Sequence, residues 1–111
     1  MNGTTKISTT TTKLKRPPEL EPLTKYGNLR LQYLEEHRPD LYSEYLQDGE
    51  LYQHCLEVQN AAEIRLRSMM KQFEAHNPPP NRNTDGLAWA SHMGMLKRSV
   101  EEIIYAELIY E

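Results

Sequence analysis

The stretch NPPPN at residues 77–81 divides the second half of the chain and decides its fold. Proline lacks the backbone N–H and its ring clashes with the preceding helical turn, so neither a helix nor a central strand runs through three prolines in a row. On each side of this stretch, apolar residues recur every three or four positions, which is the spacing of an amphipathic α-helix. The sequence therefore predicts two long helices joined by a short connector.

The apolar residues of the two long segments match when the chain is folded back at the connector. Segments of about residues 51–76 and 85–110 each span about 39 Å at 1.5 Å per residue, and the short connector forces them to pack antiparallel. Folding at the middle of the connector pairs positions whose numbers add to about 161. The predicted layers are Phe73 with Trp89, Met69 and Met70 with Met93, Leu66 with Leu96, Ala62 with Val100, and Val58 with Ile103. Thr84 or Asp85 is expected to cap the second helix.

Two shorter helices are predicted before this hairpin. Pro39 ends a helix of about residues 24–37 and suits the first turn of the next helix, residues 39–47. Gly49 supplies the left-handed conformation that ends the second helix. The apolar stripe of this second helix, expected to lie across the groove of the hairpin, is Leu41, Tyr42, Tyr45 and Leu46. No segment alternates like a strand, so the predicted class is all-α, a long antiparallel helical hairpin with two short N-terminal helices packed on it.

Residues 1–24 differ in composition from the rest of the chain. Six of the first twelve residues are threonine, three prolines follow by position 22, and there is no aromatic residue. Such a stretch cannot bury enough apolar surface to offset an ordering entropy of about 1–2 kcal/mol per residue. We therefore expect a flexible, disordered Thr/Pro-rich arm at residues 1–24 and a single helical domain at residues 25–111.

Charge divides at the same boundary. Residues 1–24 carry four basic and two acidic side chains, whereas residues 25–111 carry nine and fourteen, which gives net charges of +2 and −5. An acidic body lacks the diffuse positive field of a strong nonspecific DNA-binding protein. The lone cysteine, Cys55, excludes an internal disulfide and suits a reducing compartment. With no apolar run of roughly 18–20 residues and no secretory signal, a cytoplasmic protein without membrane contact is expected.

Residues that could support catalysis or bind a metal are scattered. The four histidines lack partners at ligand spacing and are expected at the surface, while Cys55 lies in an apolar stripe as a buried thiol. The carboxylate pairs Glu35-Glu36 and Glu101-Glu102 are expected on outward faces, and there is no glycine-rich phosphate loop. We therefore expect no catalytic residue, no metal and no cofactor, and a protein that binds rather than an enzyme.

Two sets of residues are candidates for binding. The cations that could meet the phosphates of nucleic acid are Lys25, Arg30 and Arg38 around the first short helix, with Arg65, Arg67 and Lys71 as a second cluster. The tyrosines gathered in the first half of the body are Tyr26, Tyr33, Tyr42, Tyr45 and Tyr52. Tyrosine is common at interfaces and also completes small cores with its hydroxyl at the surface. A partner interface and a core role both stay open for these five.

Several short blocks follow one another along the body. They are Lys25-Tyr26-Gly27, Tyr33-Leu34-x-Glu36-His37-Arg38-Pro39, Leu41-Tyr42, Gly49-x-Leu51-Tyr52-x-His54 and Glu101-Glu102-Ile103-Ile104-x-Ala106-Glu107-Leu108-Ile109-Tyr110. In this order and spacing they resemble the transposon-encoded TnpV family, and they leave the N-terminal arm outside. The resemblance implies a small accessory protein of a bacterial transposon or conjugative element, found near recombination genes and sometimes likened to excisionases. It brings no catalytic residues.

Two functional hypotheses follow. The first is a non-enzymatic accessory protein that acts in a nucleoprotein complex during excision, transfer or regulation of the element, with Lys25, Arg30 and Arg38 on element DNA. The second is a protein-interaction module without DNA contact, which binds the element's recombinase or a host regulatory protein, or self-associates into a homo-oligomeric helical bundle. Salt separates the two, because phosphate contacts make affinity fall steeply as salt rises.

Overall fold

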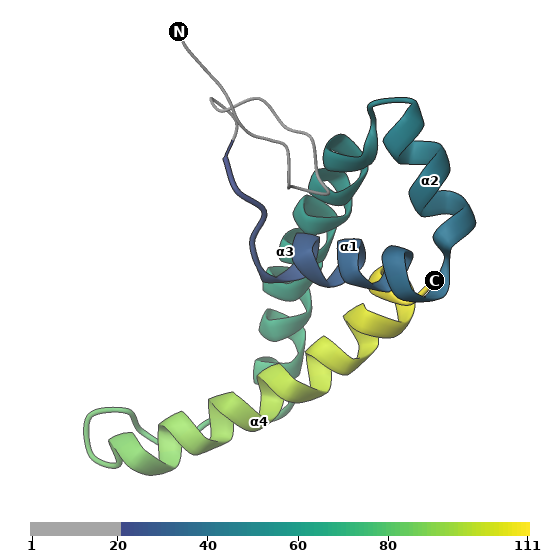
Figure 1. Ribbon diagram of the computed structural model, residues 1–111. Helices are drawn as coiled ribbons and strands as arrows, with labels where there is room; N and C mark the ends of the chain where they lie inside the picture. The colour runs from purple at the N-terminus through teal and green to yellow at the C-terminus, as the bar shows by residue number, and fades with distance from the viewer. Residues whose placement is uncertain (1–20) are drawn as a thin grey trace, which may run out of the picture. The chain divides into compact units, whose positions relative to one another are not determined.

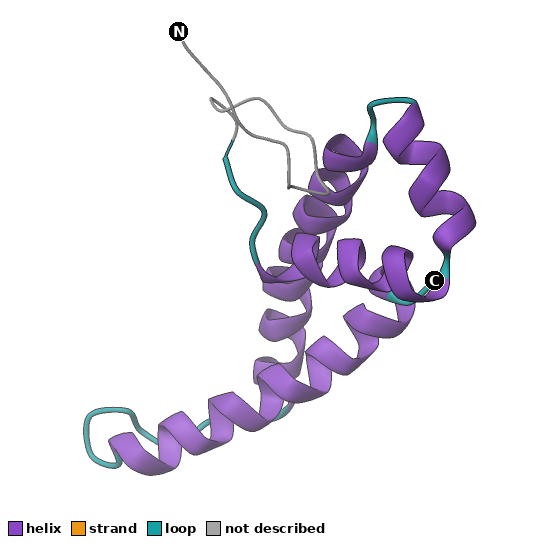
Figure 2. Ribbon diagram, in the orientation of Figure 1, coloured by secondary structure: helices purple, strands orange, loops and turns teal. Residues whose placement is uncertain are grey.

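The computed structural model describes residues 21–111, which are helical along most of their length (Figures 1 and 2). The elements are α1 (Lys25–His37), α2 (Pro39–Gln47), α3 (Leu51–His76), α4 (Gly86–Ile104) and the π-helix η2 (Tyr105–Ile109). Within the described range there is no strand, so the all-α prediction is confirmed. Residues 1–20 of the predicted arm lie outside the described residues, whereas Leu23, also assigned to the arm, is buried.

The helix boundaries follow the positions of proline and glycine. Pro39 opens α2 directly after α1, and Gly49 has a φ of 73° between α2 and α3. That left-handed conformation favours glycine, which has no Cβ to clash. At the start of α4 the Oδ1 atom of Asp85 accepts the N–H of Ala88 at 3.2 Å. Of the two predicted caps, Asp85 rather than Thr84 is therefore the one that forms.

The C-terminal helix differs from its prediction as one α-helix to about residue 110. The α-helix ends at Ile104 and the backbone continues as η2, where the Tyr110 N–H donates to the Tyr105 carbonyl at 2.8 Å. The buried apolar residues of this region are Leu96, Val100, Ile104 and Ile109. The first three are spaced by four and the last by five, and a π turn closes over five residues. The wider turn therefore keeps Ile109 among the buried side chains.

The chain divides into two compact units, Met1–Gln59 and Asn60–Glu111, with the boundary inside α3. In the described part of the first unit, α1 and α2 pack on the N-terminal turns of α3. The core residues of this unit are Leu23, Leu34, Leu51, Tyr52 and Cys55, against which Leu31, Leu41, Tyr42, Tyr45, Leu46 and Leu56 pack. The predicted apolar stripe of α2 therefore faces a core that it shares with α1 and the start of α3.

The second unit contains the C-terminal part of α3, the connector, α4 and η2. The Arg65 Nε atom pairs with Glu107 Oε1 at 3.2 Å, and the His92 Nε2 atom lies 2.7 Å from the Asn77 carbonyl oxygen. From Arg65 to Asn77 the partner residue moves back along the chain from Glu107 to His92, which confirms the antiparallel hairpin.

The register of the hairpin is displaced from the predicted one at these contacts. By the predicted register Arg65 would face Leu96, whereas it reaches Glu107. Helical side chains point toward the N-terminus of their own helix. In an antiparallel pair, each side chain therefore reaches residues of the partner helix that are closer to the partner's C-terminus. Every position of the predicted layers is buried or half-buried, while the individual pairs stay a prediction.

Glu101 corrects the prediction that both members of its carboxylate pair face outward. Its side chain is buried, at 8% exposure, while Glu102 is exposed. Successive residues of an α-helix are rotated by about 100°. The two neighbours therefore cannot both lie opposite the face that buries Val100 and Ile104.

Candidate interaction site

Helix α1 buries a positively charged side chain. Tyr26, Arg30 and Leu34, at steps of four, are all buried, and Arg30 is only 7% exposed. The Arg30 Nε–H donates to His54 Nε2 at 3.1 Å, and its guanidinium carbon lies 5.7 Å from the centroid of the Tyr33 ring. The hydrogen bond and the aromatic ring compensate the burial of the charge. This arginine therefore holds α1 to α3.

His54 connects α3 to both short helices. Its ring stacks on Tyr45 of α2, with 4.3 Å between centroids and 16° between planes. Because Nε2 accepts the hydrogen of Arg30, the neutral ring carries its own hydrogen on Nδ1. Burial lowers the pKa of His54, the Arg30 guanidinium lowers it further, and the Glu57 carboxylate acts in the opposite direction. The fold therefore favours the neutral imidazole, although the sequence had placed this histidine at the surface.

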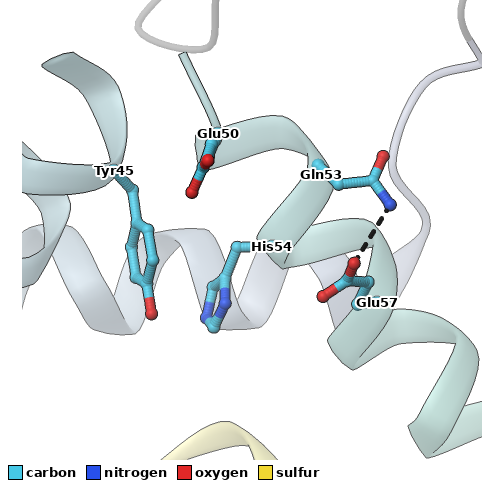
Figure 3. Close-up of a pocket in the computed structure, with 5 residues that line it drawn as sticks. All are labelled: Tyr45, Glu50, Gln53, His54 and Glu57. Atoms are coloured by element: carbon cyan, nitrogen blue, oxygen red, sulfur yellow. Dashed lines mark hydrogen bonds between the residues drawn. The ribbon is translucent and has the colours of Figure 1, made fainter. Parts of the chain in front are cut away.

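Tyr45 and His54 form one side of a pocket in the first unit (Figure 3). The pocket has a volume of about 380 Å³ and is lined by Tyr45, Glu50, Gln53, His54 and Glu57. Figure 3 shows Glu50 above the two rings and Glu57 on the side of His54 away from Tyr45. The Gln53 Nε2–H donates to Glu57 Oε2 at 3.2 Å. The pocket therefore combines an aromatic wall with two carboxylates.

Gly27 lies where the segment before α1 meets α3. A Cβ atom added there would be 2.5 Å from Gln59 Oε1 and 3.0 Å from Leu23 Cδ2. Gln59 is itself buried, and its Oε1 accepts the Thr24 N–H at 2.6 Å. The glycine of the Lys25-Tyr26-Gly27 block therefore permits a close approach that fixes the start of α1.

The structure places the three cations proposed for phosphate contact in different environments. Lys25 is exposed, with its Nζ atom 5.8 Å from the centroid of the Tyr26 ring. Arg30 is buried, and Arg38 pairs with Asp40 at 3.4 Å with 40% of its side chain exposed. Its hydrogen bond lowers the pKa of the Asp40 carboxyl. Lys25 and Arg38 are thus accessible, and Arg38 is paired with an acidic neighbour.

Four of the five tyrosines lie in or against the core of the first unit, while the Tyr33 ring stacks on His37. Tyr26 and Tyr52 are buried, while Tyr33, Tyr42 and Tyr45 are half-buried. The Tyr52 hydroxyl donates to the Glu21 carbonyl at 2.6 Å. These positions match a core role, and among the five it is Tyr45 that also lines the pocket.

Several large apolar side chains are exposed on the second unit, and among them Leu87 was not singled out by the sequence patterns. The large exposed ones among residues 21–111 are Ile64, Leu87, Met95 and Tyr110. Leu87 is 86% exposed and Met95 49%, and they lie about two turns apart on one face of α4. A signal for Leu87 exists in the sequence, because Trp89 follows two positions later and residues two apart point to opposite sides of a helix.

Cys55 is the buried thiol that the sequence predicts. Burial raises the pKa of the Cys55 thiol to about 11, although the Arg30 charge lowers it, and the side chain is fully buried. A thiol in this state is a small apolar side chain rather than a nucleophile.

In the described part of the chain no three His, Cys, Asp or Glu side chains are grouped to hold a metal ion. No helix of residues 21–111 has the length and apolar character needed to cross a membrane.

Comparison with known proteins identifies the family. A family model described as Transposon-encoded protein TnpV matches residues 6–109, a range that includes Gly27, Arg30 and His54. The match also takes in most of the N-terminal stretch, which the sequence blocks had left outside the resemblance. No curated protein and no solved structure matches the chain. Because the family model covers nearly its whole length, the chain belongs to the transposon-encoded protein TnpV family.

Proposed function

We propose that this transposon-associated chain is a non-enzymatic accessory protein that acts by binding a protein of the element's recombination complex. The observation that carries the proposal is the exposure of Leu87, at 86%, with Met95, at 49%, about two turns further along the same face of α4. Exposed apolar groups that lie together on a small protein are typical of protein-binding surfaces.

Charge supports a protein partner over direct DNA contact. Affinity for DNA comes mainly from cations that neutralise phosphates. The body carries a net charge of −5, and Arg30, the central cation of the predicted cluster, is buried against His54. An acidic body favours instead a partner with basic surface, as DNA-binding recombinases have.

The test is a binding titration between the full chain and the recombinase encoded by the same element. Leu87→Ser with Met95→Ser should weaken binding at least tenfold, since burying each apolar side chain is worth about 1.5–3 kcal/mol. Ala61→Ser, at an exposed position on α3 of the same unit, is the matched control and should change affinity less than twofold. Equal affinity of the double variant and the parent, or no binding by the parent, would rule out this mode.

Direct contact with element DNA is a second candidate function. It is favoured by a shallow depression of about 360 Å³ on α3, lined by Ile64, Arg67, Ser68 and Lys71. Arg67 and Lys71 are exposed and one turn apart, so both could meet phosphate oxygens. Gel-shift titrations on element-end DNA at several salt concentrations test this candidate.

The DNA titrations have two informative variants. Arg67→Ala with Lys71→Ala should reduce the salt slope by about 1.8 if each cation neutralises one phosphate, and Lys25→Ala with Arg38→Ala tests the cluster around α1. If the chain does not bind DNA, or binds it with an affinity that does not depend on salt, direct contact with element DNA is ruled out. Sedimentation at several concentrations tests the remaining alternative, self-association, which predicts a mass that rises with concentration.

A further inference from the structure

The pocket lined by Tyr45, Glu50, Gln53, His54 and Glu57 lies in the first unit and is separate from the apolar residues of α4. Its volume of about 380 Å³ is at the small end of ligand pockets, which run roughly 300–1,000 Å³. A pocket of this size on an acidic unit suits one side chain of a partner better than a large cofactor.

We propose that this pocket binds an arginine side chain from a basic segment of a partner protein. The carboxylates of Glu50 and Glu57 are the charged groups of its lining, and both residues are exposed to solvent. A planar guanidinium pairs with carboxylates through two parallel hydrogen bonds, which an ammonium group cannot do.

The aromatic wall supports the choice of a cation. Tyr45 and His54 stack face to face at 4.3 Å beside the carboxylates, and Figure 3 shows both rings on the side of the pocket below Glu50. Aromatic rings attract cations, and guanidinium groups also stack on them. Carboxylates alone would take any cation, whereas carboxylates beside flat rings favour arginine.

His54 is neutral, so the aromatic wall of the pocket carries no positive charge that would repel a cation. Its Nε2 atom accepts a hydrogen bond from Arg30, which requires the unprotonated nitrogen. Among residues 21–111, the positive group in contact with this histidine is the buried Arg30, and the negative groups of the pocket lining are Glu50 and Glu57. The two negative charges of the carboxylates exceed the single positive charge of the guanidinium, so the net charge around the pocket is negative.

A titration of the full, isotope-labelled chain with the peptide acetyl-Gly-Arg-Gly-amide tests the proposal by NMR. We expect saturable shifts of the amides of Glu50, His54 and Glu57, with weaker binding of the Gly-Lys-Gly peptide. The peptide with citrulline in place of arginine has the same shape without the charge and should not bind. Equal binding of the citrulline peptide, or shifts that never saturate, would overturn the proposal.

Paired variants separate the pocket from general electrostatics. Glu50→Gln with Glu57→Gln should weaken the arginine peptide at least fivefold. The matched control is Glu36→Gln with Glu44→Gln, which removes the same charge from exposed positions of the same unit. Glu36 also accepts a hydrogen bond from a glutamine one turn away, at 3.3 Å, as Glu57 does at 3.2 Å. The control should change affinity less than twofold, and an equal loss in both pairs would refute a specific pocket.

The outcome is independent of the proposed recombinase contact. The peptide titration needs no partner protein, so its failure would leave the binding effect of Leu87 and Met95 untouched. Conversely, if the chain does not bind the recombinase, the peptide titration can still show a saturable arginine site in the first unit.

Discussion

The two units of this chain are stabilised differently although α3 runs through both. The first unit encloses polar groups, with Arg30 bound to His54 and Gln59 bound to the Thr24 backbone. The second unit buries an apolar row at steps of four along α4 and exposes Leu87. Residues 25–59 carry three basic and seven acidic side chains, whereas residues 60–111 carry six and seven. The comparison teaches that the first unit adds specific buried polar pairs to its apolar core, whereas the second unit relies mainly on the apolar periodicity of α4.

The largest expected effect comes from Leu34→Ala in the core of the first unit. Leu34 is fully buried, so the change should lower the free energy of unfolding by about 2–5 kcal/mol. The single tryptophan, Trp89, lies in the second unit and reports on that unit in urea unfolding. Because α3 is one uninterrupted helix, Trp89 fluorescence and far-UV circular dichroism should shift together. A Trp89 transition that stays at the parent midpoint would mean that the units unfold separately.

Gly27→Ala and Gly86→Ala form a matched pair across the two units. At Gly27 the new methyl group would crowd Gln59 and Leu23, so the free energy of unfolding should fall by about 1–3 kcal/mol. At Gly86 nothing lies within 4 Å of the added atom, so alanine should stabilise α4 by up to about 1 kcal/mol. Thermal unfolding of both variants checks the opposite signs. Changes of the same sign would contradict the close approach at Gly27.

Acidification should destabilise the protein through His54. The folded state lowers the pKa of this histidine below the usual 6.5, so the unfolded chain binds the extra proton. The stabilising contribution is complete above pH 6.5 and is lost as the pH falls through the lowered pKa. Each unit by which the pKa is lowered corresponds to about 1.4 kcal/mol of this contribution.

Urea unfolding at several pH values measures this effect in two variants. His54→Gln keeps a hydrogen-bond acceptor for Arg30 but does not titrate, so its stability should depend less on pH. His76→Gln, at an exposed position of the second unit, is the control for the loss of a histidine side chain. If both variants follow the parent, His54 is not the group responsible.

The smallest expected effect is on the ion pair of the second unit. The side chains of Arg65 and Glu107 are each 46% exposed, and such pairs contribute about 0.2–1 kcal/mol. A double-mutant cycle with Arg65→Ala and Glu107→Gln, measured at low and high salt, should give a coupling in this range that shrinks with salt. A coupling well above it would show that the pair does more than assist the antiparallel packing.

Local signals in the sequence predicted the helix boundaries well. Pro39, Gly49 and the proline triplet act on their own backbone and need no distant partner, so their effects were visible in advance. The antiparallel hairpin followed from the short connector, and the apolar stripe of α2 from its periodicity.

The buried polar groups of the first unit were not predicted, because charged residues were not considered as members of the buried helix faces. Tyr26, Arg30 and Leu34 stand at steps of four, which places the arginine on the buried face of α1. Its acceptor, His54, is 24 residues away, and no local sequence pattern predicts this hydrogen bond. The pocket depends on the same pairing, so only Tyr45 of its lining had been singled out as a binding candidate.

The π turn after Ile104 has a consequence for tolerance to changes in chain length. The step of five between Ile104 and Ile109 contains one residue more than an α-helix needs to return to the same side. Losing one residue between them would give an ordinary step of four and leave the last isoleucine in place. Losing one between Val100 and Ile104 would rotate everything that follows by about 100°. The end of this chain can therefore absorb a one-residue deletion that the preceding turn cannot.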